Sequence, residues 1–195
     1  MDLVLASVAL VLLAPVMLAT ALAIRLVMGG PVVFTHPRVG RNGRLFRCCK
    51  FRTMVADGDA VLQRHLERDA AAALEWRETR KLRNDPRVTP LGRALRKSSL
   101  DELPQLFNVI RGEMSCVGPR PIVGEELARY GTAAAAYLSV RPGVTGAWQV
   151  GGRSSLSYEA RVALDRAYVQ NWSLWGDVVI ILRTIPALMS HGDAA

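Results

Sequence analysis

Residues 96–121 read RKSSLDELPQLFNVIRGEMSCVGPRP, and two adjacent carboxylates, Asp101 and Glu102, stand at the centre of this stretch. Ser99 precedes Glu102 by three residues, which is the spacing of a helix capping box, and Pro104 suits a first helical turn. The stretch therefore predicts a short helix that begins near the two acids. The positive end of that helix and the basic residues on both sides are expected to lower both carboxyl pKa values and keep the acids ionised.

Neighbouring residues of a helix point about 100° apart, so the two acids are expected to serve two roles rather than share one. One carboxylate suits attack as a nucleophile, and the other suits a metal ion. An Asp-Glu pair behind serines is also an ordinary helix cap. The pair alone does not decide between a cap and a reactive site.

The bulk composition predicts one domain with an anionic partner. The chain has 195 residues, a formal net charge of +8 and three cysteines. Such a charge fits nucleic acid, anionic lipid or a phosphorylated substrate, although the arginine richness also fits a genomic base bias. Cys48 and Cys49 are neighbours and cannot easily pair, so reduced thiols and a cytosolic catalytic domain are expected. The sequence contains no zinc-binding motif, P-loop or dinucleotide fingerprint.

An uncharged apolar segment lies between Asp2 and Arg25. As a helix it would be roughly 33 Å long, which is enough to cross a bilayer. A cleaved signal peptide fits poorly because a basic region is missing before the segment. Pro15 stands in the middle and favours a bent helix, so the residues leave open whether the segment spans the membrane or dips into it. Positive-inside logic places the basic remainder in the cytoplasm.

Two β-prone runs, residues 32–34 and 45–51, flank an Asn42-Gly43 turn signal and predict an antiparallel hairpin. On the second run Lys50 and Arg52 are expected on one face, where two cations would suit a diphosphate. An exposed strand edge with solvated bases is the alternative.

The remaining segments read mainly as helices. Thr89 and Pro90 are expected to begin a short helix that carries Arg96. In Gly118-Pro119-Arg120-Pro121, prolines stiffen a loop that presents Arg120 either to a nucleotide diphosphate or simply at a turn. The last helix has a broad apolar face that suits the membrane interface or core packing. Further helices are expected at residues 57–83, 122–138, 158–171 and 173–189, with a compact loop at 141–155.

The run LDELPQLFNVIRGEMSCVGPRP, residues 100–121, and the run KFRTM, residues 50–54, resemble the signature of the bacterial sugar transferases. These are monotopic polyprenyl-phosphate phosphoglycosyl transferases. The resemblance implies an α+β, mainly helical monotopic membrane protein with a small antiparallel hairpin and interfacial amphipathic helices. It implies a re-entrant membrane helix over residues 1–30 and a cytosolic-face catalytic domain over residues 31–195. The family has a Ser-Pro break in its membrane helix, but Ala14 replaces that serine here.

The resemblance also implies the chemistry. A hexose 1-phosphate, from galactose or glucose, would pass from a UDP-sugar to undecaprenyl phosphate with release of UMP. This would be the first membrane step of exopolysaccharide, O-antigen or capsule synthesis. Trp148 resembles the branch of the family that transfers hexose phosphates, and the choice of sugar stays open. The implied site comprises Asp101 as the nucleophile that becomes a covalent aspartyl-phosphosugar, Glu102 as the Mg²⁺ ligand, and Lys50, Arg52, Arg96 and Arg120 as phosphate-binding residues.

The expected location is the cytoplasmic face of the bacterial inner (plasma) membrane, with UDP-sugar, undecaprenyl phosphate and membrane lipids as partners. A homo-oligomer is left open. Nucleic acid is not expected, since no series of stacking aromatics accompanies the basic residues. No further transmembrane region precedes the catalytic part, so the minimal form of the family is expected. Two other classes stay open: a non-catalytic membrane-anchored basic adaptor, and a structural subunit of a glycan-synthesis complex.

Overall fold

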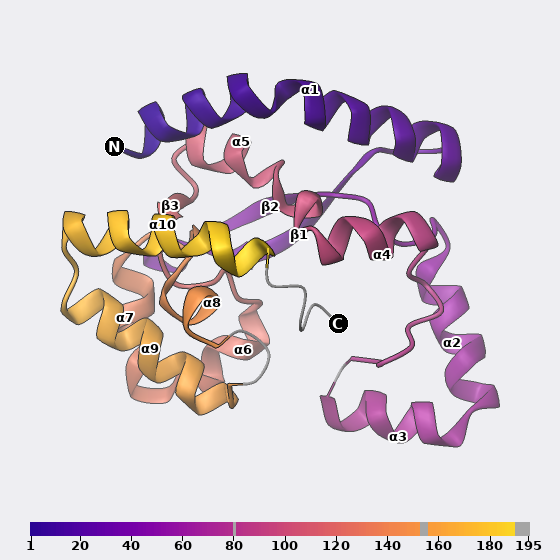
Figure 1. Cartoon of the computed structure of the whole chain (residues 1–195). Coiled ribbons are helices and arrows are strands. Elements are labelled where there is room, and N and C mark those ends of the chain that lie inside the picture. The colour runs from indigo at the N-terminus through magenta and orange to yellow at the C-terminus, as the bar shows by residue number, and fades with distance from the viewer. Residues whose placement is uncertain (80, 153–155, 190–195) are drawn as a thin grey trace.

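Helices surround a small β-hairpin in the computed structural model, which describes residues 1–79, 81–152 and 156–189 (Figure 1). The α-helices are α1 (Asp2–Met28), α2 (Gly58–Arg68), α3 (Ala70–Thr79), α4 (Pro90–Lys97), α5 (Gln105–Ile110), α6 (Gly124–Arg129), α7 (Ala134–Ser139), α8 (Ala147–Gly151), α9 (Tyr158–Gln170) and α10 (Leu174–Met189). The strands are β1 (Val33–Val39), β2 (Leu45–Phe51), β3 (Ser115–Val117) and β4 (Gly143–Thr145), and the 3₁₀ turns are η1 (Arg41–Gly43), η2 (Leu100–Glu102) and η3 (Gly131–Ala133). The predicted mainly helical α+β class is confirmed.

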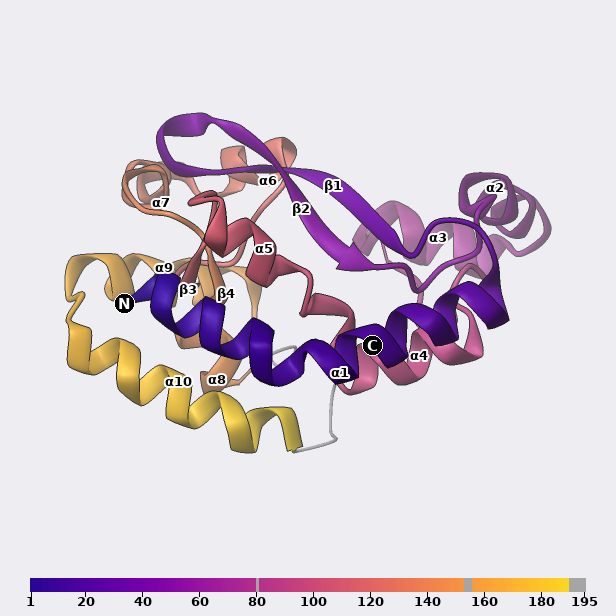
Figure 2. The same cartoon turned by 90° about the horizontal axis from the view of Figure 1, so that it is seen from above.

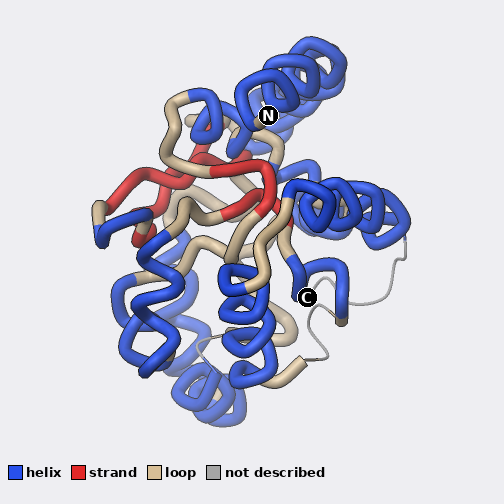
Figure 3. Tube along the Cα trace, turned by 90° about the vertical axis from the view of Figure 1, so that its left-hand side faces the viewer, coloured by secondary structure: helices blue, strands red, loops and turns tan. Residues whose placement is uncertain are grey.

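The predicted hairpin is confirmed. Strands β1 and β2 pair antiparallel, with Val33 opposite Phe51 and Val39 opposite Leu45. Asn42 has a φ of 58° in the turn, the left-handed conformation that asparagine tolerates better than most residues. Figure 3 shows the strands lying between α1 and the helices of the second half of the chain.

Helix α1 lies along one side of the domain and packs on α5 and β3 (Figure 1). Its buried face contains Ala6, Met17, Thr20 and Ile24, while its outer face exposes leucines and valines along its whole length. Pro15 lies inside one continuous helix, and the axis changes direction about half-way along (Figure 2). The structure therefore has a bent helix, without a non-helical break. By length and composition, α1 is the one helix among the described residues that could cross a membrane.

Both ends of α1 are tied to the same domain. At the first turn, Asp2 Oδ1 accepts hydrogen bonds from Ser115 Oγ at 3.0 Å and from the backbone N–H of Cys116 at 3.2 Å. At the other end, Arg52 Nη2 donates to the carbonyl of Met28 at 3.1 Å and to that of Gly29. A guanidinium at the last carbonyls of a helix also complements the helix dipole.

Three apolar clusters join the elements. The first lies between α1, β2 and α5, the second between β1, α7 and α9, and the third between α1, β2 and α4. The buried members of the first cluster are Ala6, Phe46, Cys48, Leu106, Val109 and Met114. Because α5 packs on both α1 and β2, the acidic stretch just before α5 is held against the hairpin. All three cysteines are free, as expected.

Several predicted helix boundaries are wrong. The helix expected at 57–83 divides at Asp69, because the Asp69 carboxylate accepts from the N–H of Ala72 and starts a new helix. The helix expected at 122–138 divides at Gly131, whose φ is 50°. The expected loop at 141–155 contains β4, which pairs in parallel with β3, and α8. The helix expected at 158–171 is confirmed as α9.

The last predicted helix is confirmed as α10, with one buried and one exposed side. Asp177 is buried and accepts hydrogen bonds from Tyr168 Oη at 2.7 Å and Trp172 Nε1 at 3.1 Å. On the opposite side Trp175 is 73% exposed, with Leu182 and Ile185 also exposed. This helix therefore buries a side that carries Asp177 with partly buried valines and isoleucines, and it leaves an apolar side with Trp175 exposed.

Candidate active site

The two acids lie in η2, the 3₁₀ turn between α4 and α5. Ser99 is left-handed, with φ 55°, and its side chain does not cap the turn. The predicted capping box is therefore wrong. The N–H of Glu102 bonds instead to the backbone carbonyl of Ser99 at 3.2 Å, since a left-handed Ser99 follows the end of α4 and starts the 3₁₀ turn.

Asn108 fixes α5, and with it η2, against strand β2. Its side chain is completely buried. Its Oδ1 accepts from the N–H of Cys49 at 2.9 Å, and its Nδ2 donates to the carbonyl of Arg47 at 2.8 Å and to Glu113 Oε2 at 2.6 Å. The amide thus takes the place of a neighbouring strand along this part of β2. Sequence reasoning missed Asn108, although an amide between apolar residues of this short helix was the available signal.

Lys50, the next residue on β2, contacts both acids. Its Nζ lies 2.6 Å from Glu102 Oε1 and 3.9 Å from Asp101 Oδ2. The long lysine side chain reaches both carboxylates even though they are consecutive residues. The two acids therefore share one cation. The sequence predicted two separate roles for the acids and did not predict this shared contact.

The environment separates the acidities of the two carboxyl groups. Asp101 is 7% exposed, and burial raises its pKa to about 6, against the opposing charges of Lys50 and Arg96. The expected lowering of the Asp101 pKa is wrong, because burial outweighs the nearby cations. The pKa of Glu102 lies below its ordinary value: burial, the largest influence, acts upward, but the charges of Lys50 and Arg120 together outweigh it. Pairs of acids set apart in this way are typical of catalytic sites.

The predicted phosphate-binding arginines occupy three different places. Arg96, in the last turn of α4, donates from Nε to Thr53 Oγ1 at 3.0 Å, and its charge acts on Asp101. Arg120 has its guanidinium 5.7 Å from the centre of the Trp148 ring. Arg52 is 6% exposed and turned toward the end of α1, where its Nε and Nη1 have no hydrogen-bond partner in the described part of the chain. Lys50 is thus the predicted cation that touches the acid pair.

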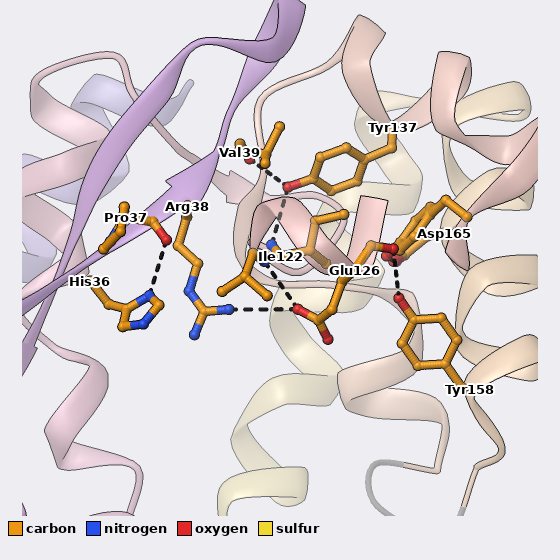
Figure 4. Close-up of polar contacts among 11 residues, drawn as sticks. His36, Pro37, Arg38, Val39, Ile122, Glu126, Tyr137, Tyr158 and Asp165 are labelled. Atoms are coloured by element: carbon orange, nitrogen blue, oxygen red, sulfur yellow. Dashed lines mark hydrogen bonds and ion pairs between the residues drawn. The ribbon is translucent and has the colours of Figure 1, made fainter. Parts of the chain in front are cut away.

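Arg38, on β1, is a further basic residue near the site that sequence reasoning missed. Its Nη1 lies 3.7 Å from Glu126 Oε2 (Figure 4). Its charge, with those of Lys50 and Arg120, acts to lower the pKa of Glu102. Its place in an arginine-rich turn sequence gave no signal that separated it from the arginines beside it.

Comparison with known proteins identifies the family. The family model described as "Bacterial sugar transferase" matches residues 1–191. The chain belongs to the bacterial sugar transferase family. It is 55% identical over 193 residues to the exopolysaccharide production protein ExoY of Rhizobium meliloti (strain 1021), covering 98% of this chain and 85% of the relative.

Two further relatives of this sugar transferase have names that state a reaction. The undecaprenyl-phosphate galactose phosphotransferase of Salmonella typhimurium is 51% identical over 85% of this chain and 35% of its own length. The UDP-glucose:undecaprenyl-phosphate glucose-1-phosphate transferase of Caulobacter vibrioides is 41% identical over 100% of this chain and 70% of its own length. The prediction of a phosphoglycosyl transferase is confirmed, in place of a non-catalytic adaptor or structural subunit.

The carboxylates of the sugar transferase fit a magnesium ion that takes some of its ligands from the protein and the others from a substrate. Among residues 1–79, 81–152 and 156–189, no group of three or more His, Cys, Asp and Glu is placed to hold a metal. Asp101 and Glu102 supply two adjacent carboxyl groups, one buried and the other half-buried. Mg²⁺ in phosphoryl-transfer enzymes is commonly held by one or two carboxylates together with substrate phosphates and water. A thin protein ligand set of this kind is therefore compatible with magnesium.

Proposed function

We propose that this sugar transferase moves a hexose 1-phosphate from a UDP-sugar to undecaprenyl phosphate and releases UMP. The observation that carries the proposal is the acid pair that shares Lys50, with Asp101 buried and Glu102 held ionised. The names of the Salmonella and Caulobacter relatives support the two substrates. The reaction would be the first membrane step of exopolysaccharide, O-antigen or capsule synthesis, and the name of the Rhizobium relative agrees with the first of these.

Asp101 is the nucleophile in this proposal. Its carboxylate oxygen attacks the phosphorus that carries the sugar, and the bond from that phosphorus to the bridging oxygen breaks, so UMP leaves with the bridging oxygen. An oxygen of undecaprenyl phosphate then attacks the same phosphorus. The bond to Asp101 breaks, which restores the carboxylate and gives the lipid diphosphate sugar. A covalent intermediate divides one difficult transfer into two easier ones.

The remaining site residues would stabilise the negative charge of the substrate phosphates. Lys50 contacts the acid pair, and the charges of Arg96 and Arg120 act on it. These three residues would stabilise the phosphoryl oxygens, which is the main contribution of a protein to this reaction class. Glu102, ionised because of Lys50 and Arg120, is the proposed Mg²⁺ ligand. When bound, Mg²⁺ would neutralise charge on the diphosphate oxygens. Arg52 lies at the end of α1, and we retain it as a phosphate-binding residue only because two of its nitrogens have no hydrogen-bond partner among the described residues.

The membrane position follows from the apolar surfaces. We propose that residues 1–30 enter one leaflet and return, because Asp2 and Arg52 tie both ends of α1 to one domain. The exposed side of α10, with Trp175, would lie in the interface, where tryptophan is favoured. The basic catalytic domain then faces the cytoplasm at the inner membrane. In this proposed position the acid pair would lie where a soluble nucleotide sugar and a lipid phosphate can meet.

The test is UMP release from UDP-galactose, UDP-glucose and UDP-N-acetyl sugars by the purified full chain, with Mg²⁺ and undecaprenyl phosphate in detergent. One UDP-hexose is expected to support turnover, and mass spectrometry without the lipid acceptor is expected to find a phosphohexose adduct on Asp101. Asp101→Asn should release no UMP above background, whereas Asp59→Asn, at an exposed acid, should match the parent. Full turnover by Asp101→Asn, or UMP release that always requires both substrates together, would refute the covalent route. The relatives are named for both galactose and glucose, so the panel decides the sugar.

A further inference from the structure

Arg38 is held close to the proposed site by the backbone around it. The N–H of Val39 donates to the carbonyl of Ile122 at 2.9 Å, which joins the end of β1 to the segment that follows the Pro119-Arg120-Pro121 loop. The bridge joins Val39 and Ile122. Arg38 directly precedes the first of these residues, and Arg120 lies two residues before the second.

Tyr137 locks this bridge from the inside. Its hydroxyl donates to the carbonyl of Val39 at 2.6 Å and accepts from the N–H of Ile122 at 3.3 Å (Figure 4). The ring is 3% exposed and packs edge-on against Tyr130, whose hydroxyl donates to the buried Asp165 at 2.8 Å. Strand β4 holds the other side of the loop, since the N–H of Gly143 donates to the carbonyl of Pro119. The position of Arg38 beside the Arg120 loop is thus built into the core.

A second guanidinium, that of Arg120, and the acids Glu126 and Glu102 lie near Arg38. After burial, the charge of Arg120 is the next influence that lowers the pKa of the Arg38 guanidinium, so the two cations act on each other. Glu126 is the acid paired with Arg38, and at 3.7 Å it is outside ideal hydrogen-bond distance. Glu126 is also engaged elsewhere, because its Oε2 accepts from the N–H of Val123 at the start of α6. Two guanidinium groups held near one backbone bridge are suited to bind an added anion, even with Glu126 paired to Arg38 and Glu102 within the influence of both arginines.

We propose that Arg38 is a substrate-binding residue which, together with Arg120, holds the diphosphate of the nucleotide sugar. Glu126 is its resting counter-ion, and a substrate phosphate replaces that weak pair when the nucleotide binds. This inference rests on the proposed function and adds a residue to the nucleotide side of the site.

The experiment measures nucleotide binding separately from turnover. Calorimetry with UMP, and with the UDP-hexose in the Asp101→Asn background, gives affinities that do not depend on the reaction. Arg38→Ala is expected to weaken UDP-hexose binding at least tenfold. Arg38→Lys keeps the charge but loses the planar fork, so an intermediate loss is expected. In steady-state kinetics Arg38→Ala should raise the KM for UDP-hexose and leave the KM for undecaprenyl phosphate within about twofold.

Two control variants separate binding from structure. Arg47→Ala removes an exposed arginine of the same hairpin, which bonds to Thr35 Oγ1, and should leave the affinity unchanged. Glu126→Gln keeps an acceptor for the N–H of Val123 but removes the charge. If Glu126 is only a resting counter-ion, this variant binds UDP-hexose as tightly as the parent or more tightly. A loss in Glu126→Gln equal to that in Arg38→Ala, with equal losses of Tm, would show a structural ion pair and overturn the proposal.

The outcomes also distinguish this inference from the reaction. If UMP is released normally and Arg38→Ala binds UDP-hexose within twofold of the parent, the role of Arg38 is wrong and the reaction stands. If UDP-hexose binds through Arg38 but no UMP is ever released, the reaction is wrong and the binding role stands. If the parent binds neither UMP nor any UDP-hexose, the binding role of Arg38 is refuted.

Discussion

Asp101 is buried and lies near two cations, and the balance of these effects on its pKa sets the pH at which it can react. Burial raises its pKa to about 6, while the charges of Lys50 and Arg96 act in the opposite direction. The proposed nucleophile must be a carboxylate, so protonation removes it. The rate of UMP formation is therefore expected to fall as the pH drops through about 6, and to be constant above about 7.

Lys50→Met tests whether the charge of Lys50 helps to set the pKa of Asp101. The lysine lowers the pKa of Asp101, so its loss should move the acidic limb of the profile to higher pH as well as reduce the rate. Rapid-quench measurement of the first turnover over about pH 5–8 would show both effects. A parent rate that stays constant down to about pH 5 would mean that Asp101 is well solvated or is not the reacting group.

That Asp101, Glu102 and Lys50 belong to one site was predictable because each lies in a recognisable motif, whereas the contact of one lysine with both acids was not. Arg38 and Asn108 were not, for a physical reason. Asn108 acts on backbone groups of a strand 59 residues earlier, and no local pattern reports such a partner. Arg38 is set apart from other arginines only by a bridge between β1 and the segment after Arg120. Both depend on contacts that form only when the chain is folded.

At the scale of elements, the pairing of α5 with β2 depends on one amide. Asn108→Ala would leave the N–H of Cys49 and the carbonyl of Arg47 buried without a partner. This should lower the free energy of unfolding by about 2–4 kcal/mol and, by loosening β2, move Lys50 away from the acids.

Thermal unfolding in detergent and UMP release measure the two effects of Asn108→Ala. Asn171→Ala is the control, because this exposed amide bonds locally, to the carbonyl of Ala167 in the helix that it follows. It should change stability by less than about 0.5 kcal/mol. Equal effects of the two substitutions would show that the amide of Asn108 does not hold α5 on the hairpin.

The seating of α4 depends on a glycine. A Cβ at Gly92 would lie 1.9 Å from the carbonyl oxygen of Thr53, which belongs to the backbone and cannot turn aside. Gly92→Ala must therefore push α4 away, break the bond between Arg96 Nε and Thr53 Oγ1, and cost about 1–3 kcal/mol or more.

Gly124→Ala is the matched control for Gly92→Ala, since a Cβ at this exposed helix start meets nothing within 4 Å. Gly92→Ala should lower the stability and raise the KM for the UDP-sugar. Gly124→Ala should change neither. An unchanged KM in a destabilised Gly92→Ala enzyme would mean that Arg96 does not contact the substrate.

Element boundaries show where local sequence signals end. The hairpin has a turn signal and α4 has a cap signal in the sequence, and both form as predicted. The helices expected at 158–171 and 173–189 also form, as α9 and α10. The divided helices do not follow from periodicity, because Asp69 and Gly131 act through a new cap and a positive φ. Strand β4 was missed because it is three residues long and pairs with another short strand far along the chain.

At the scale of the whole molecule, α1 is both the most apolar element and an integral part of the core. Ala6 and Ile24 are completely buried against the domain, near opposite ends of the helix. Crossing a bilayer would pull one end away and break either the Asp2 contacts or the Arg52 contacts. Entry into one leaflet keeps both, with the outer leucines and valines in lipid.

This argument predicts that the N-terminus and the catalytic domain lie on the same side of the membrane. A cysteine in a short tag ahead of Met1 and a cysteine at Ser139, which is exposed, should react with an impermeant maleimide in the same vesicle orientation. The natural thiols give little background: Cys48 and Cys49 are buried, and burial raises the pKa of Cys116 to about 11. Both sites should be labelled in inside-out vesicles and protected in intact spheroplasts. Labelling of the tag from outside while Ser139→Cys stays protected would show that α1 crosses, and the contacts of Asp2 with Ser115 and Cys116 could not then form.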